Sequence, residues 1–154
     1  MIASQRFAMV ITTLFGLGFS KFAPGTVGSI FGLITAWLIV SYTSNTYLIA
    51  AATLVFFIGF FLSNIYSKYL NTNDPSRIII DELVGQWITL FFLPPEVLYY
   101  LIGFILFRFF DIFKPWPVNW ADSNLHGGLG IMLDDVFAGI YSCIIVSTLF
   151  NMIG

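Results

Sequence analysis

The sequence predicts an all-α integral membrane protein, with about five transmembrane helices and a short N-terminal re-entrant or interfacial helix. Three observations support this fold class. First, 58% of the 154 residues are hydrophobic and only 9% are charged, whereas a soluble domain carries about 25% charged residues. Second, long apolar segments alternate with short polar turns. Third, several Trp and Tyr residues lie near the ends of these segments, where a membrane interface favours them. With no linker or repeat, we expect one membrane-embedded domain over residues 1–154.

The N-terminal apolar stretch, Phe7–Phe19, is expected to enter the membrane or lie on it without crossing. It is shorter than the roughly 20 residues that a spanning helix needs. Arg6 before it imitates the start of a signal peptide. However, Lys21 would stand three positions before a cut after Ala23, which makes a poor cleavage site.

Two long apolar segments predict the first two transmembrane helices. They run from Gly28 to about Tyr42 and from Tyr47 to about Tyr66, and the polar turn Ser44–Thr46 separates them.

The third helix is predicted over Pro75–Leu93. Asp74 is a suitable N-cap, and proline is favoured at the first helical position. Pro94 and Pro95 end the helix because proline cannot continue it. At about 1.5 Å per residue, the segment is long enough to cross a bilayer.

The last two helices are predicted from their boundaries. The fourth runs from Glu96 or Val97 to about Lys114, where Pro115–Pro117 stops it. The fifth begins near Gly130 and runs to the C-terminus.

If the N-terminal stretch does not cross the membrane and each of the five predicted helices crosses it once, nearly all charges fall at the face where the chain begins. Glu96 is the only charge expected at the other face. The basic residues at the first face are Arg6, Lys21, Lys68, Arg77, Arg108 and Lys114. By the positive-inside rule, this face is cytoplasmic. Lys68 and Arg77 are interpreted as topology charges that face the lipid headgroups.

Acidic residues from three predicted helices gather at the same face. They are Asp81, Glu82, Asp111, Asp134 and Asp135. Charges near hydrocarbon are costly unless they are paired, hydrated or bound to a metal. Because carboxylate oxygens suit hard cations, a divalent ion such as magnesium, Mg²⁺, is the simplest way to relieve their mutual repulsion. These acids are therefore candidate metal ligands and candidate catalytic groups.

The neighbouring acids Asp81 and Glu82 have a structural alternative. Adjacent helix positions point about 100° apart, so the two carboxylates need not serve one ion. One of them could form a salt bridge with Arg108. Their expected depth in the membrane favours a functional role.

Two further charged motifs also allow two interpretations. Arg108, Asp111 and Lys114 stand three positions apart. They could form a self-satisfied ladder of charges, or a metal ligand between two phosphate-binding cations. Asp134 and Asp135 could compensate the dipole at a helix start, which explains one acid better than two.

The segment Lys21–Ser29 has the features of an anion-binding helix start. Gly25 allows a tight turn, Thr26 can cap the helix that follows, and free N–H groups there favour phosphate. Lys21 adds a positive charge. The alternative is a plain capped turn before a transmembrane helix.

Composition excludes several kinds of site. A net charge of −2 gives no nucleic-acid footprint. Cys143, the only cysteine, allows no internal disulfide, no cysteine-based zinc site and no Cys-x5-Arg phosphatase loop. His126, the only histidine, is interpreted as a loop residue and cannot form a His-rich metal site. Asp122 is interpreted as a turn residue.

Carboxylates, cations and glycine-rich backbone at a membrane surface together describe a Mg²⁺–phosphate site. Such a site hydrolyses a phosphate ester by metal-assisted attack of water, with cations neutralising the phosphoryl oxygens. A lipid substrate would arrive laterally from the inner leaflet. The main alternative is a small cation- or proton-coupled membrane transporter. Against it, the acids lie at one face and no inverted repeat is visible. A purely structural membrane protein would have little reason for so many ionisable residues.

Three strings resemble the bacterial phosphatidylglycerophosphatase A family. They are FAPGTVGS, DPSRIIIDELVG, and the long string from Phe107 to Gly139 that contains FDIFKPWP and GGLGIMLDDVFAG. The resemblance covers about Gly16 to Tyr141. It implies a Mg²⁺-dependent, multi-pass phosphatase of the bacterial inner membrane with a cytoplasmic active site. Its reaction would convert the lipid phosphatidylglycerophosphate to phosphatidylglycerol and phosphate in phospholipid biosynthesis. The expected partners are this substrate and membrane lipids, and a homo-oligomer is compatible with the sequence.

The resemblance also implies roles for single residues. The acidic positions that bind metal and carry catalysis are Asp81, Glu82, Asp111, Asp134 and Asp135. The positions on the phosphate side are Lys21, Gly25, Thr26, Arg108 and Lys114. The resemblance does not indicate which of these acids activates the attacking water molecule.

Overall fold

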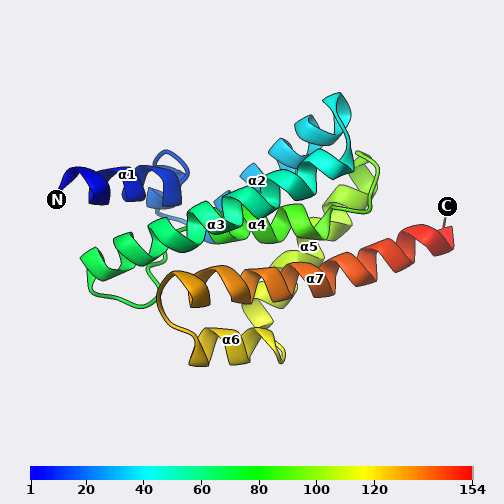
Figure 1. Cartoon of the computed structure of the whole chain (residues 1–154). Coiled ribbons are helices and arrows are strands. Elements are labelled where there is room, and N and C mark those ends of the chain that lie inside the picture. Colours follow the sequence, from blue (N-terminus) through cyan, green and yellow to red (C-terminus); the bar gives the residue numbers. More distant parts are fainter. Residues whose placement is uncertain (154) are drawn as a thin grey trace.

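The chain folds into seven α-helices and contains no β-strand over residues 1–153, which the computed structural model describes (Figure 1). This confirms the predicted all-α class. The helices are α1 (Ala3–Thr12), α2 (Pro24–Tyr42), α3 (Asn45–Leu70), α4 (Ile80–Thr89), α5 (Val97–Phe113), α6 (Val118–Asn124) and α7 (Gly127–Ile153), with a 3₁₀ turn, η1 (Leu17–Phe19), before α2.

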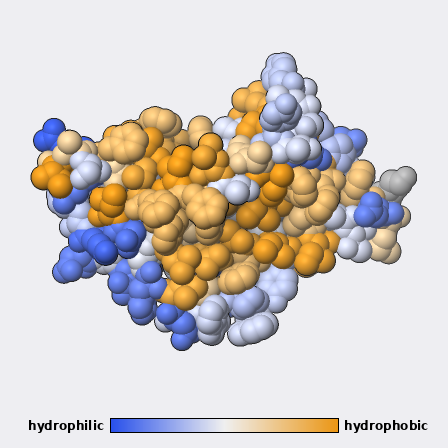
Figure 2. Space-filling view, viewed as in Figure 1, coloured by the Kyte–Doolittle hydropathy of each residue, from blue (hydrophilic) through white to orange (hydrophobic). Residues whose placement is uncertain are grey.

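Three of these helices, α2, α3 and α7, are long and apolar enough to cross a membrane. They support a membrane-associated protein. The predicted number of five spans stays a prediction, because α5 has 17 residues and α4 has only 10. Figure 2 shows apolar side chains across the middle of the visible face, and hydrophilic ones gathered near the end where α3 finishes and α7 begins.

Most predicted helices are present with small changes at their ends. The first two predicted spans correspond to α2 and α3, and the fourth corresponds to α5. The helix α2 begins earlier than expected because Pro24 occupies its first turn, a position that proline favours. The helix α7 begins at Gly127 rather than near Gly130.

The third predicted helix was placed wrongly at its start. A helix was expected from Pro75, but α4 begins at Ile80 and residues 71–79 form an irregular loop. This loop is held by the N-terminal segment. The N–H of Ile79 donates to the carbonyl oxygen of Thr12 at 2.9 Å. The carbonyl oxygen of Arg77 lies so close to Gly18 that a Cβ there would stand 2.0 Å from it. These distant contacts override the local helix signal.

The first helix, α1, is too short to cross a bilayer by itself, as predicted. It packs against α3 (Figure 1). After it the chain turns sharply through Leu14, Phe15 and Gly16, all with positive φ angles. The turn leads through η1 to the start of α2.

The short helix α4 is enclosed by α2, α3, α5 and α7. Only Glu82 and Ile88 among its residues are partly exposed. Its closest approach to α7 is at two glycines, since a Cβ on Gly139 would lie 2.6 Å from the carbonyl oxygen of Gly85. Small residues allow such close backbone contact between membrane helices. This contact brings the first turn of α4 against the first third of α7.

We expect Gly139→Leu to destabilise the chain, because even the first carbon of the new side chain would overlap the backbone of α4. Overpacking of this kind costs about 1–3 kcal/mol, so the thermal unfolding midpoint in detergent should fall by roughly 3–10 °C. The control is Ile140→Leu, at the neighbouring exposed position of α7. An unchanged midpoint in Gly139→Leu would contradict the close approach of these helices.

Candidate active site

Three carboxylates from two helices meet beside the contact between α4 and α7. Asp81 and Glu82 come from the first turn of α4, and Asp135 comes from α7. One oxygen of each lies within 4.8 Å of the others. Asp81 and Asp135 are buried, with 8% and 2% of their surface exposed. The adjacent acids Asp81 and Glu82 therefore reach the same cluster despite their different directions on the helix.

These carboxylates have the chemistry of a divalent-cation site. Each has a buried oxygen without a hydrogen-bond partner among residues 1–153, namely Asp81 Oδ1, Glu82 Oε2 and Asp135 Oδ2. Neither Asp81 nor Glu82 forms an ion pair within that part of the chain. An unpaired carboxylate in such a place costs several kcal/mol. An all-oxygen donor set of this kind fits a hard cation.

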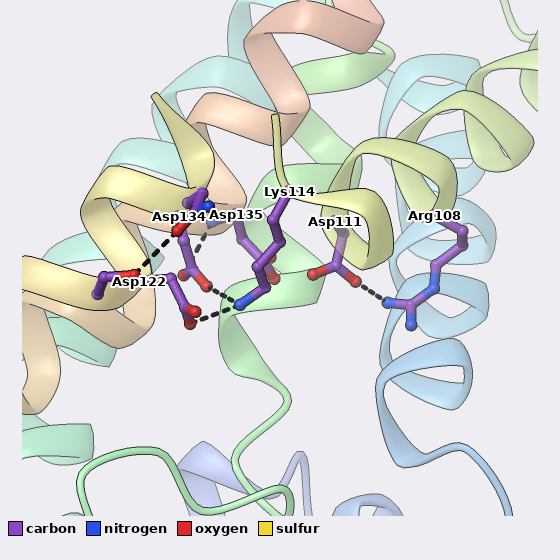
Figure 3. Close-up of polar contacts among 8 residues, drawn as sticks. Arg108, Asp111, Lys114, Asp122, Asp134 and Asp135 are labelled. Carbon is purple, nitrogen blue, oxygen red and sulfur yellow. Dashed lines mark hydrogen bonds and ion pairs between the residues drawn. The ribbon is translucent and has the colours of Figure 1, made fainter. Parts of the chain in front are cut away.

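Arg108 stands next to this cluster and is held from two sides. Its guanidinium forms an ion pair with Asp111, one turn further along α5 (Figure 3). It also donates a hydrogen bond from Nη1 to Ser29 Oγ at 3.3 Å. Gly25 lies against it: a Cβ there would stand 2.3 Å from Glu82 Oε1 and 3.1 Å from Arg108 Nη1. The start of α2 thus contacts both a carboxylate and a cation of the site.

Lys114 bridges two acids from other helices. Its Nζ lies 2.9 Å from Asp134 Oδ2 on α7 and 2.6 Å from Asp122 Oδ1 on α6 (Figure 3). Of the expected ladder of Arg108, Asp111 and Lys114, only the ion pair between Arg108 and Asp111 is present, because Lys114 pairs with Asp122 and Asp134 instead. The reason is that Lys114 adopts a left-handed conformation at the end of α5, where the chain leaves the helical path.

The two acids determine the charge of Lys114. Burial lowers the pKa of its amine, but the carboxylates of Asp134 and Asp122 outweigh burial and hold the pKa above its ordinary value. Lys114 is therefore a fixed positive charge at neutral pH.

Two predicted phosphate-side residues stand apart from these contacts. Lys21 is exposed and Thr26 is half-buried. Within residues 1–153, neither side chain forms a hydrogen bond or an ion pair. Of the three phosphate-side residues predicted at the start of α2, which are Lys21, Gly25 and Thr26, Gly25 is the one that lies against the charged groups.

Three polar residues near the charged groups were not among the site residues predicted from the sequence. Ser29 supports Arg108, and Asp122, interpreted as a turn residue, belongs to α6 and pairs with Lys114. Asp74 is not a helix cap, because α4 begins only at Ile80, and it lines a small cavity of about 120 Å³ with Asp122 and Asp134. For Ser29, the sequence signal was its place in the glycine-containing string at the start of α2. No local pattern distinguishes Asp74 or Asp122 from ordinary turn residues.

Comparison with known proteins gives one family. Residues 10–150 match the family model described as Phosphatidylglycerophosphatase A. The Escherichia coli K12 protein of that name is 39% identical over 129 residues, which cover 83% of this chain and 74% of that protein. The Haemophilus influenzae protein of the same name is 38% identical over 133 residues, covering 86% and 82%.

A third relative has a different name. The Bacteroides thetaiotaomicron protein named "Putative phosphatidylinositol-3-phosphatase" is 39% identical over 153 residues, covering 95% of each chain. No solved structure matches this chain.

We expect Gly25→Ala to weaken cation binding without unfolding the protein. The new methyl group would meet the flexible end of Glu82, so that carboxylate moves while the helices stay packed. Disturbing groups that orient a metal ligand typically weakens affinity about 10–100-fold. The measurement is the rise in thermal midpoint as Mg²⁺ is titrated, with Ile30→Ala, an exposed position on the same helix, as the control. Wild-type affinity in Gly25→Ala would show that Glu82 does not depend on this contact.

Proposed function

The chain belongs to the phosphatidylglycerophosphatase A family, and we propose that it hydrolyses phosphatidylglycerophosphate to phosphatidylglycerol and inorganic phosphate. One observation carries this proposal beyond the family match. A buried carboxylate cluster lies beside two cations, Arg108 and Lys114, that other acids hold in place. A phosphate monoester needs this combination, because its oxygens require positive charge while a water molecule is activated nearby.

We propose that Asp81, Glu82 and Asp135 hold Mg²⁺. The support is their unpartnered buried oxygens and their mutual distance. When bound, the ion would polarise a phosphoryl oxygen and lower the pKa of a water molecule. Asp111 and Asp134 border the same site, and each also pairs with a cation. Their proposed task is to position Arg108 and Lys114 against the substrate.

Different residues of the chain are proposed to have different roles in hydrolysis. Arg108 and Lys114 neutralise the non-bridging oxygens of the phosphoryl group. Lys21, three residues before α2, and Thr26, in the first turn of α2, are proposed to attract the phosphate as it enters, because both lie outside the contacts that hold the site together. A carboxylate of the cluster takes a proton from the attacking water as the bond from phosphorus to the ester oxygen breaks. The same carboxylate then gives this proton to the oxygen of the leaving lipid alcohol, and inorganic phosphate remains.

We further propose that the site faces the cytoplasmic side of a bacterial inner membrane. The hydrophilic side chains in Figure 2 gather at the end of the molecule where α3 finishes and α7 begins. Lys68, at the end of α3, belongs to this end, and the positive-inside rule assigns such residues to the cytoplasm. The substrate would enter laterally from the inner leaflet.

A second candidate substrate is a phosphatidylinositol phosphate. It is favoured by the Bacteroides relative, which matches over 95% of both chains and whose name contains an inositol lipid. The bond that breaks is again a phosphate monoester on a lipid headgroup. The two candidates differ in the polyol that carries the phosphate, so the same catalytic residues would serve either one.

We expect Asp135→Asn to abolish most phosphate release from phosphatidylglycerophosphate in detergent micelles with Mg²⁺. Removing one charge from the cluster should lower kcat by about a hundredfold or more. The matched control is Glu96→Gln, which neutralises an exposed acid before α5. Wild-type turnover in Asp135→Asn would remove this residue from the site, and a wild-type protein without turnover would refute the activity itself.

Removal of divalent ions should reversibly stop the reaction. Excess EDTA is expected to abolish phosphate release, and added Mg²⁺ should restore it. Mg²⁺ should also raise the thermal midpoint of the wild-type protein, by mass action on the folded state. This shift should shrink in Asp135→Asn and persist in Glu96→Gln. Full activity in excess chelator would contradict a metal-dependent mechanism.

A further inference from the structure

A second polar pocket opens near the end of α3 and the start of α7, beside the charged site. It encloses about 620 Å³. Its lining includes three amides, two hydroxyls and an amine, from Asn64, Asn71, Asn73, Ser67, Thr72 and Lys68. None of its lining residues is acidic. The pocket is therefore rich in neutral hydrogen-bonding groups and carries one positive charge.

These groups are free to bind a ligand. Ser67 is the exception, because its Oγ donates to the carbonyl oxygen of Asn64 at 3.4 Å. Over residues 1–153, the side chains of Lys68 and Asn73 make no hydrogen bond or ion pair. Amide and hydroxyl groups that both donate and accept suit the hydroxyls of a polyol. An amine suits a phosphate oxygen.

The pocket continues toward the charged site. Asn73 and His126 line it, and both also line the small cavity that Asp122 and Asp134 border. Those two acids hold Lys114. A lipid with its phosphate monoester beside Lys114 would thus have polar space for the next part of its headgroup.

We propose that this pocket is the headgroup subsite, which binds the polyol and the phosphodiester of the lipid substrate and so determines which lipid phosphate is accepted. The inference rests on the proposed function. Asn73, between the two cavities, is assigned to the polyol. Lys68 is assigned to the phosphodiester, a more specific role than the topology charge interpreted from the sequence.

The test uses two substitutions, Asn73→Ala and Lys68→Gln, at exposed positions whose side chains hold nothing else in place. The full-length protein is measured in detergent with Mg²⁺ and phosphatidylglycerophosphate. We expect KM to rise about tenfold or more in each variant, because each loses a polar contact with the bound headgroup. We expect kcat to change less than about threefold, since neither residue touches the reacting phosphate.

Inorganic phosphate provides an internal control. It fills only the monoester position, so its inhibition constant should be the same in wild type and both variants. Arg6→Gln and Ser76→Ala change exposed residues outside the pocket and should leave KM unchanged. Arg6→Gln also controls for a general loss of attraction to the anionic lipid.

Three outcomes would overturn the headgroup subsite, and a fourth would overturn the proposed function. An unchanged KM in both pocket variants, an equal rise in Arg6→Gln, or a parallel rise in the inhibition constant of phosphate would overturn the headgroup subsite. In these cases wild-type turnover remains, so the proposed function stands. A wild-type protein that releases no phosphate from the lipid would instead refute the proposed function, and the subsite with it.

Discussion

Burial of several carboxylates inside an apolar helix bundle is the constraint on which the rest of this structure depends. Each unpaired buried charge costs several kcal/mol. Two acids are compensated within the chain, because Arg108 pairs with Asp111 and Lys114 pairs with Asp134. The remaining cluster of Asp81, Glu82 and Asp135 keeps oxygens without partners. The chain thus neutralises only part of its buried negative charge, and the uncompensated part lies where a cation can complete it.

The shortness of α4 also helps to compensate the buried negative charge. Because this helix begins at Ile80, inside the bundle, its first N–H groups and the positive end of its dipole lie beside Asp81 and Glu82. A longer helix from Pro75 would have placed the two acids in a helix interior without this support. Close packing makes the arrangement feasible, since Gly25 and Gly85 leave room for a carboxylate and for the backbone of α7.

The sequence alone was sufficient for the fold class and for most helices, because long apolar segments and prolines are local signals. It also predicted that Asp81, Glu82 and Asp135 lie close together, although the five crossings on which that expectation rested stay a prediction. It was insufficient where contacts between residues far apart in the chain determine the local structure. The start of α4 depends on Thr12 and Gly18, which lie far away in the chain. The pairing of Lys114 with Asp122 depends on how the chain leaves α5.

The enclosure of α4 also bears on the order in which the protein can be assembled. A helix of 10 residues is too short to settle across a bilayer by itself. The described helix that covers it most extensively, α7, is synthesised after it. The full enclosure of α4 therefore forms only after α7 has been made. A nascent chain that has not yet reached α7 has no Asp135, so the carboxylate cluster cannot exist until residue 135 has been translated.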